Sequence, residues 1–184
     1  MMKKTLMLLL SGAFVFAAFS QRIVIHGKEG NRPLTWNDFK GRPNAASEFY
    51  ANTGWKISYT MPPMKVTRDS VPLTGFVVTM ELDKEKSWVK KGKETPALLK
   101  HEQTHFDIGR LCLIELVAAL GKTYVVPAEM SKKLGPIFNS INGKYHQMGV
   151  QYDVETNHSI NKEAQERWEV FVAKELVRMG GEKQ

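Results

Sequence analysis

A long helical pattern between Thr95 and Gly121 is the feature of this sequence that most constrains its fold. Thr95 is suited to cap the first turn of a helix, and Pro96 is suited to the first helical position. Apolar residues then recur at helical spacing as far as Leu120, and Gly121 is a reasonable stop. The segment therefore predicts one long helix in the middle of the chain.

The segments before this helix predict strands, and those after it predict further helices. Apolar and polar residues alternate in the first strand, and the second is rich in β-branched and aromatic residues. In the first of the later helices we expect breaks near Gly135-Pro136 and Asn142-Gly143. The two strands are expected at 53–61 and 75–82. The two later helices are expected at about 128–148 and 161–180, and residues 150–160 connect them. This order favours an α+β fold with N-terminal antiparallel strands.

The central helix carries the string His-Glu-Gln-Thr-His, which starts at His101 and ends at His105. Residues four apart on a helix lie about 40° apart around its axis, so both imidazoles can reach one metal ion. Glu102 lies about 100° from His101. It would stand beside such an ion and could take a proton from a zinc-bound water. Both histidines share a stripe with apolar residues, whereas Asp107 on the opposite face is expected to pair with a neighbouring basic residue.

A catalytic zinc ion normally has three protein ligands and a water molecule, so the motif needs one more partner. The extended pattern H-E-x-x-H-x-x-G-x-x-H is absent, because Ile108 and Leu111 stand where its glycine and third histidine would be. Glu115 and Cys112 lie about 15 and 10 Å beyond His105 along the helix, which is too far. The third ligand is therefore expected from another part of the chain.

Two other segments offer candidates for the third ligand. Glu129 opens the next helix and is geometrically possible, although the helix dipole alone also favours a glutamate there. The string YDVETNH brings together four ligating or acidic groups: Tyr152, Asp153, Glu155 and His158. Each of these could also be a plain surface or capping residue. Tyr152 could donate a hydrogen bond to the oxyanion formed during hydrolysis, with packing as its alternative role.

The first twenty residues predict a cleaved signal peptide, and residues 21–184 a single domain. Two lysines precede an apolar run, and Ala18-Phe19-Ser20 is a small-x-small cleavage pattern. The run is shorter than the roughly 20 apolar residues that span a bilayer. No later segment is long and apolar enough to cross a membrane. We therefore expect an exported protein, periplasmic or extracellular, with no integral membrane segment after cleavage.

Charge and cysteine content narrow the range of partners. The formal net charge is +7, and loss of the two signal-peptide lysines would leave +5. The basic residues are scattered and form no dense stripe, so the sequence gives little support for nucleic-acid binding. Cys112 is the only cysteine, which excludes an intramolecular disulfide. Its leucine neighbours predict a buried hydrophobic side chain rather than a nucleophile.

The strings LTWNDFKGRP, SWV, LLKHEQTHFDIGRL and YDVETNH occur in this order, and Gln165 and Trp168 follow them. The sequence in this respect resembles domain of unknown function 922, a family of bacterial secreted proteins described as predicted zinc-dependent proteases. The resemblance covers about residues 34–168. It implies His101 and His105 as ligands, Glu102 as the catalytic base and a role for residues 152–158. The family often has glycine after the last histidine, where this chain has serine.

With this resemblance, we rank the candidates for the third zinc ligand in the order His158, then Asp153 and Glu155, then Glu129. The leading hypothesis is a secreted zinc metallopeptidase whose helical, zincin-like half carries the motif on its central helix. It would act on a protein or peptide substrate. The alternatives are a non-catalytic exported protein with a structural or vestigial metal site that binds envelope components, and a protein without metal whose histidines are satisfied by core hydrogen bonds.

Overall fold

The computed structural model describes residues 20–65 and 67–180. The predicted signal peptide therefore lies outside the described residues, apart from Ser20. The strands are β1 (Ser20–Ile25), β2 (Lys28–Glu29), β3 (Ala51–Asn52), β4 (Trp55–Thr60), β5 (Val71–Pro72), β6 (Val77–Leu82), β7 (Trp88–Val89) and β8 (Tyr124–Val125). The helices are α1 (Pro96–Gly121), α2 (Met130–Thr156) and α3 (Lys162–Arg178), with short 3₁₀ turns η1 (Trp36–Asp38) and η2 (Pro127–Glu129). The fold is mixed α+β, with N-terminal strands and three C-terminal helices.

The main sheet has four strands in the order β2-β1-β6-β4. β4 pairs antiparallel with β6, and β1 pairs antiparallel with β2, as predicted for N-terminal strands. β1 pairs parallel with β6, however, from Ser20 opposite Val77 to Val24 opposite Glu81. The expectation of an all-antiparallel sheet is therefore wrong. The long connection between β1 and β6 allows the chain to return to the starting edge, which parallel pairing requires.

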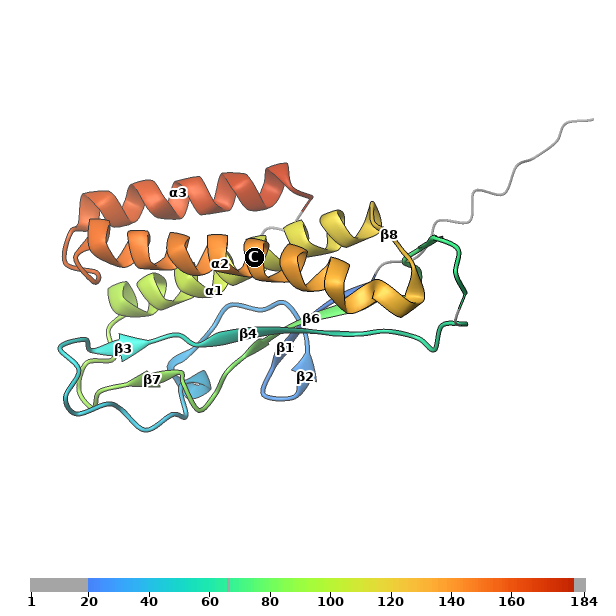
Figure 1. The fold of residues 1–184 in the computed structure, drawn as a ribbon. Coiled ribbons are helices and arrows are strands. Elements are labelled where there is room, and N and C mark those ends of the chain that lie inside the picture. Colours follow the sequence, from blue (N-terminus) through green and yellow to red (C-terminus); the bar gives the residue numbers. More distant parts are fainter. Residues whose placement is uncertain (1–19, 66, 181–184) are drawn as a thin grey trace, which may run out of the picture.

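The three helices lie together on one side of the main sheet, with α1 nearest to the strands (Figure 1). Thr95 caps α1 by accepting a hydrogen bond from Leu98 N at 3.2 Å, and the helix ends at Gly121 as predicted. Gly109 lets α1 approach the sheet closely, since a Cβ there would lie 2.5 Å from Met80 Cε. α1 thus forms the centre of the molecule, between the sheet and the other two helices.

α2 differs from its prediction in length and continuity. It is one helix from Met130 to Thr156, with Pro136 near its start, and it includes most of the segment expected to connect two helices. Its inward side chains Leu134, Tyr145 and Tyr152 are buried. Burial of this face stabilises the helix more than its glycines and proline destabilise it. The YDVETNH string therefore begins on the last turns of a helix.

Among the described residues, no helix combines the length and the apolar character needed to cross a membrane. Cys112 is buried, as predicted, and burial raises the pKa of its thiol to about 12. A thiol in this state is a poor nucleophile, which agrees with a packing role.

Candidate metal centre

Two histidines of α1 and one aspartate of α2 converge between the two helices. Asp153 Oδ1 lies 3.1 Å from His101 Nε2 and 2.9 Å from His105 Nε2. The three potential ligand atoms all lie within 4.8 Å of one another. This is the possible metal-binding group that the structure brings together.

The donor set and its spacing suit zinc. Two nitrogen ligands and one carboxylate oxygen match a common composition of catalytic zinc sites. Ligand atoms placed tetrahedrally at zinc distances of about 2.0–2.2 Å lie roughly 3.3–3.5 Å from one another. The contacts of Asp153 to the two imidazoles are only slightly shorter than this. A small outward movement of the carboxylate would therefore accommodate the ion.

His158, predicted as the first choice for third ligand, stands outside this group. Its Nδ1 lies 3.3 Å from Asp153 Oδ1, on the pocket side of the carboxylate. The chain leaves α2 at Asn157, which adopts a left-handed conformation with φ 46°. Because the helix continues to Thr156, Asp153 faces the motif histidines directly. Asp153, the next candidate after His158 in the sequence ranking, therefore completes the possible metal-binding group.

The two remaining candidates are directed elsewhere. Glu155 accepts hydrogen bonds from Trp168 Nε1 and Gln151 Nε2, both at 2.7 Å. Glu129 lies in η2, where it lines a separate pocket away from the motif. Neither carboxylate belongs to the metal-binding group among the described residues.

Glu102 lies beside the three converging side chains and lines the same pocket. It is buried, and its Oε2 accepts a hydrogen bond from Thr53 Oγ1 at 2.7 Å. Burial raises the pKa of the carboxyl group, while the neighbouring imidazoles of His105 and His101 and the bond from Thr53 oppose the rise. A carboxylate with a raised pKa is a better proton acceptor at neutral pH, provided that it remains ionised.

Charge interactions among the ligands reinforce the arrangement. Burial alone would raise the pKa of Asp153, but hydrogen bonds to His101 and His105 outweigh it and lower that pKa. Burial likewise would lower the pKa of His105, but the hydrogen bond and charge of Asp153 raise it instead. The carboxylate is thus held ionised against the imidazoles, in the form that binds metal.

Tyr152 packs against the motif histidines, which is the alternative to a contact with a substrate oxyanion. It is fully buried, and its ring stacks on His101 with centroids 4.5 Å apart. Its hydroxyl is directed to the carbonyl oxygen of His101, at 3.5 Å, and it does not line the pocket. Among the described residues, His101 Nδ1 is buried without a hydrogen-bond partner. The stacked Tyr152 ring therefore orients this imidazole, a task often performed by a hydrogen bond to the second ring nitrogen.

The pocket that holds the site has a volume of about 290 Å³. Its floor is α1, and its walls are α2 and the run of residues 49–55 around β3. Several of its lining residues were not identified from the sequence as site residues: Phe49, Thr53, Trp55 and His146. Trp55 in particular is half-buried against the core and stacks on His146. No local motif marks these residues, since only tertiary packing brings them to α1.

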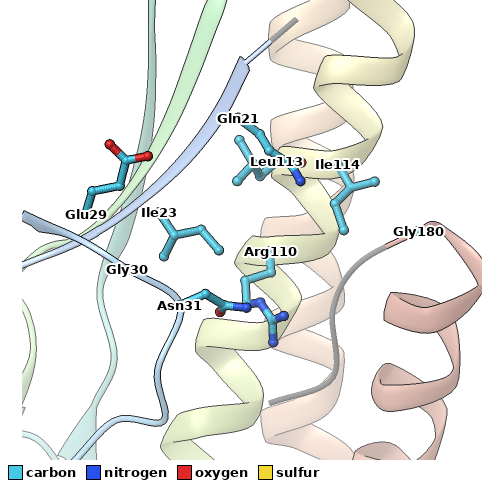
Figure 2. A pocket seen from close by; sticks show the side chains of 9 residues that line it. All are labelled: Gln21, Ile23, Glu29, Gly30, Asn31, Arg110, Leu113, Ile114 and Gly180. Carbon is cyan, nitrogen blue, oxygen red and sulfur yellow. The ribbon is translucent and has the colours of Figure 1, made fainter.

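A second pocket, of about 310 Å³, lies on the other side of α1, against β1 and the segment after β2 (Figure 2). Arg110 at this pocket is buried and pairs with Asp107 Oδ1 at 2.9 Å. This confirms the predicted structural pairing of Asp107. None of the motif residues lines this pocket, so the candidate metal centre belongs to the first pocket alone.

A family model described as "Bacterial protein of unknown function (DUF922)" matches residues 27–159. The chain belongs to this family. The match confirms the resemblance seen in the sequence, and it covers the motif, Asp153 and His158, while α3 lies beyond it. No curated protein and no solved structure matches the chain.

Proposed function

We propose that this protein is an exported zinc-dependent metallohydrolase of the zincin-like type that cleaves peptide bonds. The observation that carries the proposal is the convergence of His101, His105 and Asp153 next to the buried carboxylate of Glu102, all in one pocket. Hydrolysis of peptides is the chemistry most closely associated with His-Glu-x-x-His on a helix. Export is supported by the predicted signal peptide.

His101, His105 and Asp153 would hold the ion in this proposal. When bound, zinc would polarise the scissile carbonyl and lower the pKa of a water molecule toward neutrality. Asp153 contributes one negative charge, so the ligand set leaves a net positive charge at the centre. That charge favours the negative oxygen that develops during peptide hydrolysis.

Glu102 is the general base in this mechanism. It accepts a proton from the attacking water and then delivers that proton to the leaving amine. Two features prepare the Glu102 carboxylate for this role: the hydrogen bond from Thr53 Oγ1 and its burial. Thr53 fixes the direction of the carboxylate, and burial keeps its proton affinity high enough for both transfers.

A non-catalytic metal protein is the second candidate, and the position of His158 favours it. Its Nδ1 lies 3.3 Å from Asp153 Oδ1, close enough for rotation of the side chain to bring a fourth nitrogen ligand to the ion. Four protein ligands would close the site and leave no position for a reacting water. Such a protein would bind metal and cell-envelope components without turnover.

The test is to measure metal content and peptide hydrolysis in purified wild type, Glu102→Gln and His158→Ala. For an enzyme, all three proteins carry one zinc ion per chain, Glu102→Gln loses hydrolysis by about 100-fold or more, and His158→Ala retains measurable hydrolysis. Hydrolysis unaffected by Glu102→Gln would remove the mechanism. Loss of zinc in His158→Ala, without turnover in the wild type, would establish the closed, non-catalytic site.

A further inference from the structure

The pocket is a cleft bounded at each end by a contact between an aromatic ring and an imidazole. At one end, the ring centroids of Phe49 and His158 lie 3.9 Å apart. At the other end, Trp55 stacks on His146 with centroids 4.5 Å apart. The wall formed by α2 is about 15 Å long from His146 to Thr156, at a rise of about 1.5 Å per residue. A length of this order accommodates about four residues of an extended peptide.

The two ends of the cleft differ in how firmly they are packed. Trp55 is half-buried against α1, where a Cβ at Gly109 would lie 2.8 Å from its Cδ2 atom. Phe49 and Tyr50 at the other end are 41% and 48% exposed, and Val150, on α2 between the two ends, is 55% exposed. All three line the pocket that contains Glu102 and the metal-binding group. Clustered apolar side chains exposed next to a polar centre indicate a surface that a ligand covers.

His158 is held at this end of the cleft by an unusual backbone. Asn157, His158 and Ser159 are three consecutive non-glycine residues with positive φ, at 46°, 50° and 75°. Residues in the left-handed region carry a free-energy cost, and such strain is concentrated at ligand-binding segments. Here the strained turn holds the imidazole against the ring of Phe49. The imidazole of His158 therefore supports the ring of Phe49, which remains 41% exposed and lines the pocket.

We propose that the end of the cleft formed by Phe49 and Tyr50 binds a large apolar side chain of the substrate, and that Phe49 determines this specificity. The inference rests on the proposed function, whose substrate it defines. Neither residue carries a charge, and the ammonium group of Lys93 lies 4.3 Å from the centroid of the Tyr50 ring. A basic substrate side chain would therefore lose its water there and meet a like charge. An apolar side chain would instead cover the exposed rings and leave the water.

The test uses the full-length protein and two pools of synthetic peptides. One pool has phenylalanine fixed at its central position and the other has lysine, with the remaining positions random. Binding of labelled pools to zinc-loaded Glu102→Gln protein is measured by fluorescence anisotropy, and cleavage by the wild type is measured by mass spectrometry. The effect of Phe49→Ala is measured against Phe171→Ala, because Phe171 is 43% exposed on α3 and does not line the cleft.

We expect the phenylalanine pool to bind, and to be cleaved, about 10- to 100-fold better than the lysine pool. Phe49→Ala in the Glu102→Gln background should remove most of this preference, and Phe171→Ala should leave it unchanged. Equal binding of the two pools, or an undiminished preference in Phe49→Ala, overturns the inference. Preferential binding without cleavage of any peptide by the zinc-loaded wild type supports the apolar site and contradicts the proposed hydrolysis.

Discussion

The carboxylate of Asp153 is the single group on which the candidate site depends. Its Oδ1 atom lies within 3.3 Å of one nitrogen on each of three histidines: His101, His105 and His158. The sequence indicated the string that holds this partner and ranked His158 ahead of Asp153 within it. Helical continuation to Thr156 faces Asp153 toward α1 and leaves His158 in the following turn, so Asp153 is the third ligand that we propose.

Asp153→Asn should therefore weaken zinc binding by at least about 100-fold, since loss of an outer-sphere partner alone costs 10- to 100-fold. The amide removes the negative charge while keeping the size of the side chain. The measurement is a zinc titration in competition with a chromogenic chelator. Glu155→Gln is the matched control, two residues further along α2, because its carboxylate binds Trp168 instead of the metal group. An unchanged affinity in Asp153→Asn would return the third ligand to His158.

At the scale of elements, α1 was predictable and α2 was not. The ends of α1 are set by local signals, the Thr95 cap and Gly121, and the structure begins and ends the helix there. In α2, glycines and Pro136 predicted breaks, whereas packing of the buried tyrosines and Leu134 keeps the helix intact. Local sequence signals thus suffice to predict the bounds of the helix that carries the motif. The partner helix depends on tertiary contacts that no short stretch of sequence encodes.

The contact between α1 and the sheet predicts an asymmetry between two glycines. Gly109→Ala would place a Cβ 2.5 Å from Met80 Cε and 2.8 Å from Trp55 Cδ2, whereas Gly143→Ala in α2 meets no atom within 4 Å. We expect Gly109→Ala to lower the free energy of unfolding by about 1–3 kcal/mol. Gly143→Ala should raise it by roughly 0.5–1 kcal/mol, because alanine favours the helix. Urea unfolding measures both, and similar values for the two variants would contradict the close packing of α1.

The η1 segment predicts a pH-dependent contribution to stability. Burial would raise the pKa of Asp38, but hydrogen bonds from Arg32 and Thr35 outweigh it and lower this pKa to about 2. The pKa of Asp38 is lower in the folded protein than the ordinary aspartate value of 3.8, so the ionised carboxylate stabilises the fold at pH values above 3.8. This stabilisation is lost as the pH falls toward 2.

Asp38→Asn should therefore destabilise the fold by about 1–2 kcal/mol near neutral pH. This value already allows for solvent screening of the ion pair, because Arg32 is half-exposed. The difference from the wild type should shrink as the pH is lowered from about 4 toward 2. Urea unfolding at a series of pH values measures it. A constant difference across this range would mean that the ion pair does not supply the stabilisation.

At the scale of the whole molecule, the candidate centre joins elements that the sequence keeps far apart. α1 supplies the two histidines, α2 supplies the carboxylate, and the run around β3 supplies Thr53 and the cleft wall. On the opposite side of α1, Gln103 accepts a hydrogen bond from Leu34 N at 2.7 Å and donates one to Asp107 at 3.1 Å. The motif helix is therefore fixed on both faces. The sequence revealed the motif but not these supports, because each of them joins distant segments.

In the proposed site zinc would join α1 to α2, and the unfolded chain offers no preformed site, so zinc should stabilise the entire fold. At a free zinc concentration of about 100 times the dissociation constant, the gain is about 2.7 kcal/mol. For a chain of this size that gain raises the melting temperature by roughly 5–10 °C. Thermal unfolding followed by circular dichroism, with zinc and with a chelator, measures the shift. Asp153→Asn should show almost none of it at the same zinc concentration, and an equal shift in that variant would place the stabilising ion at another site.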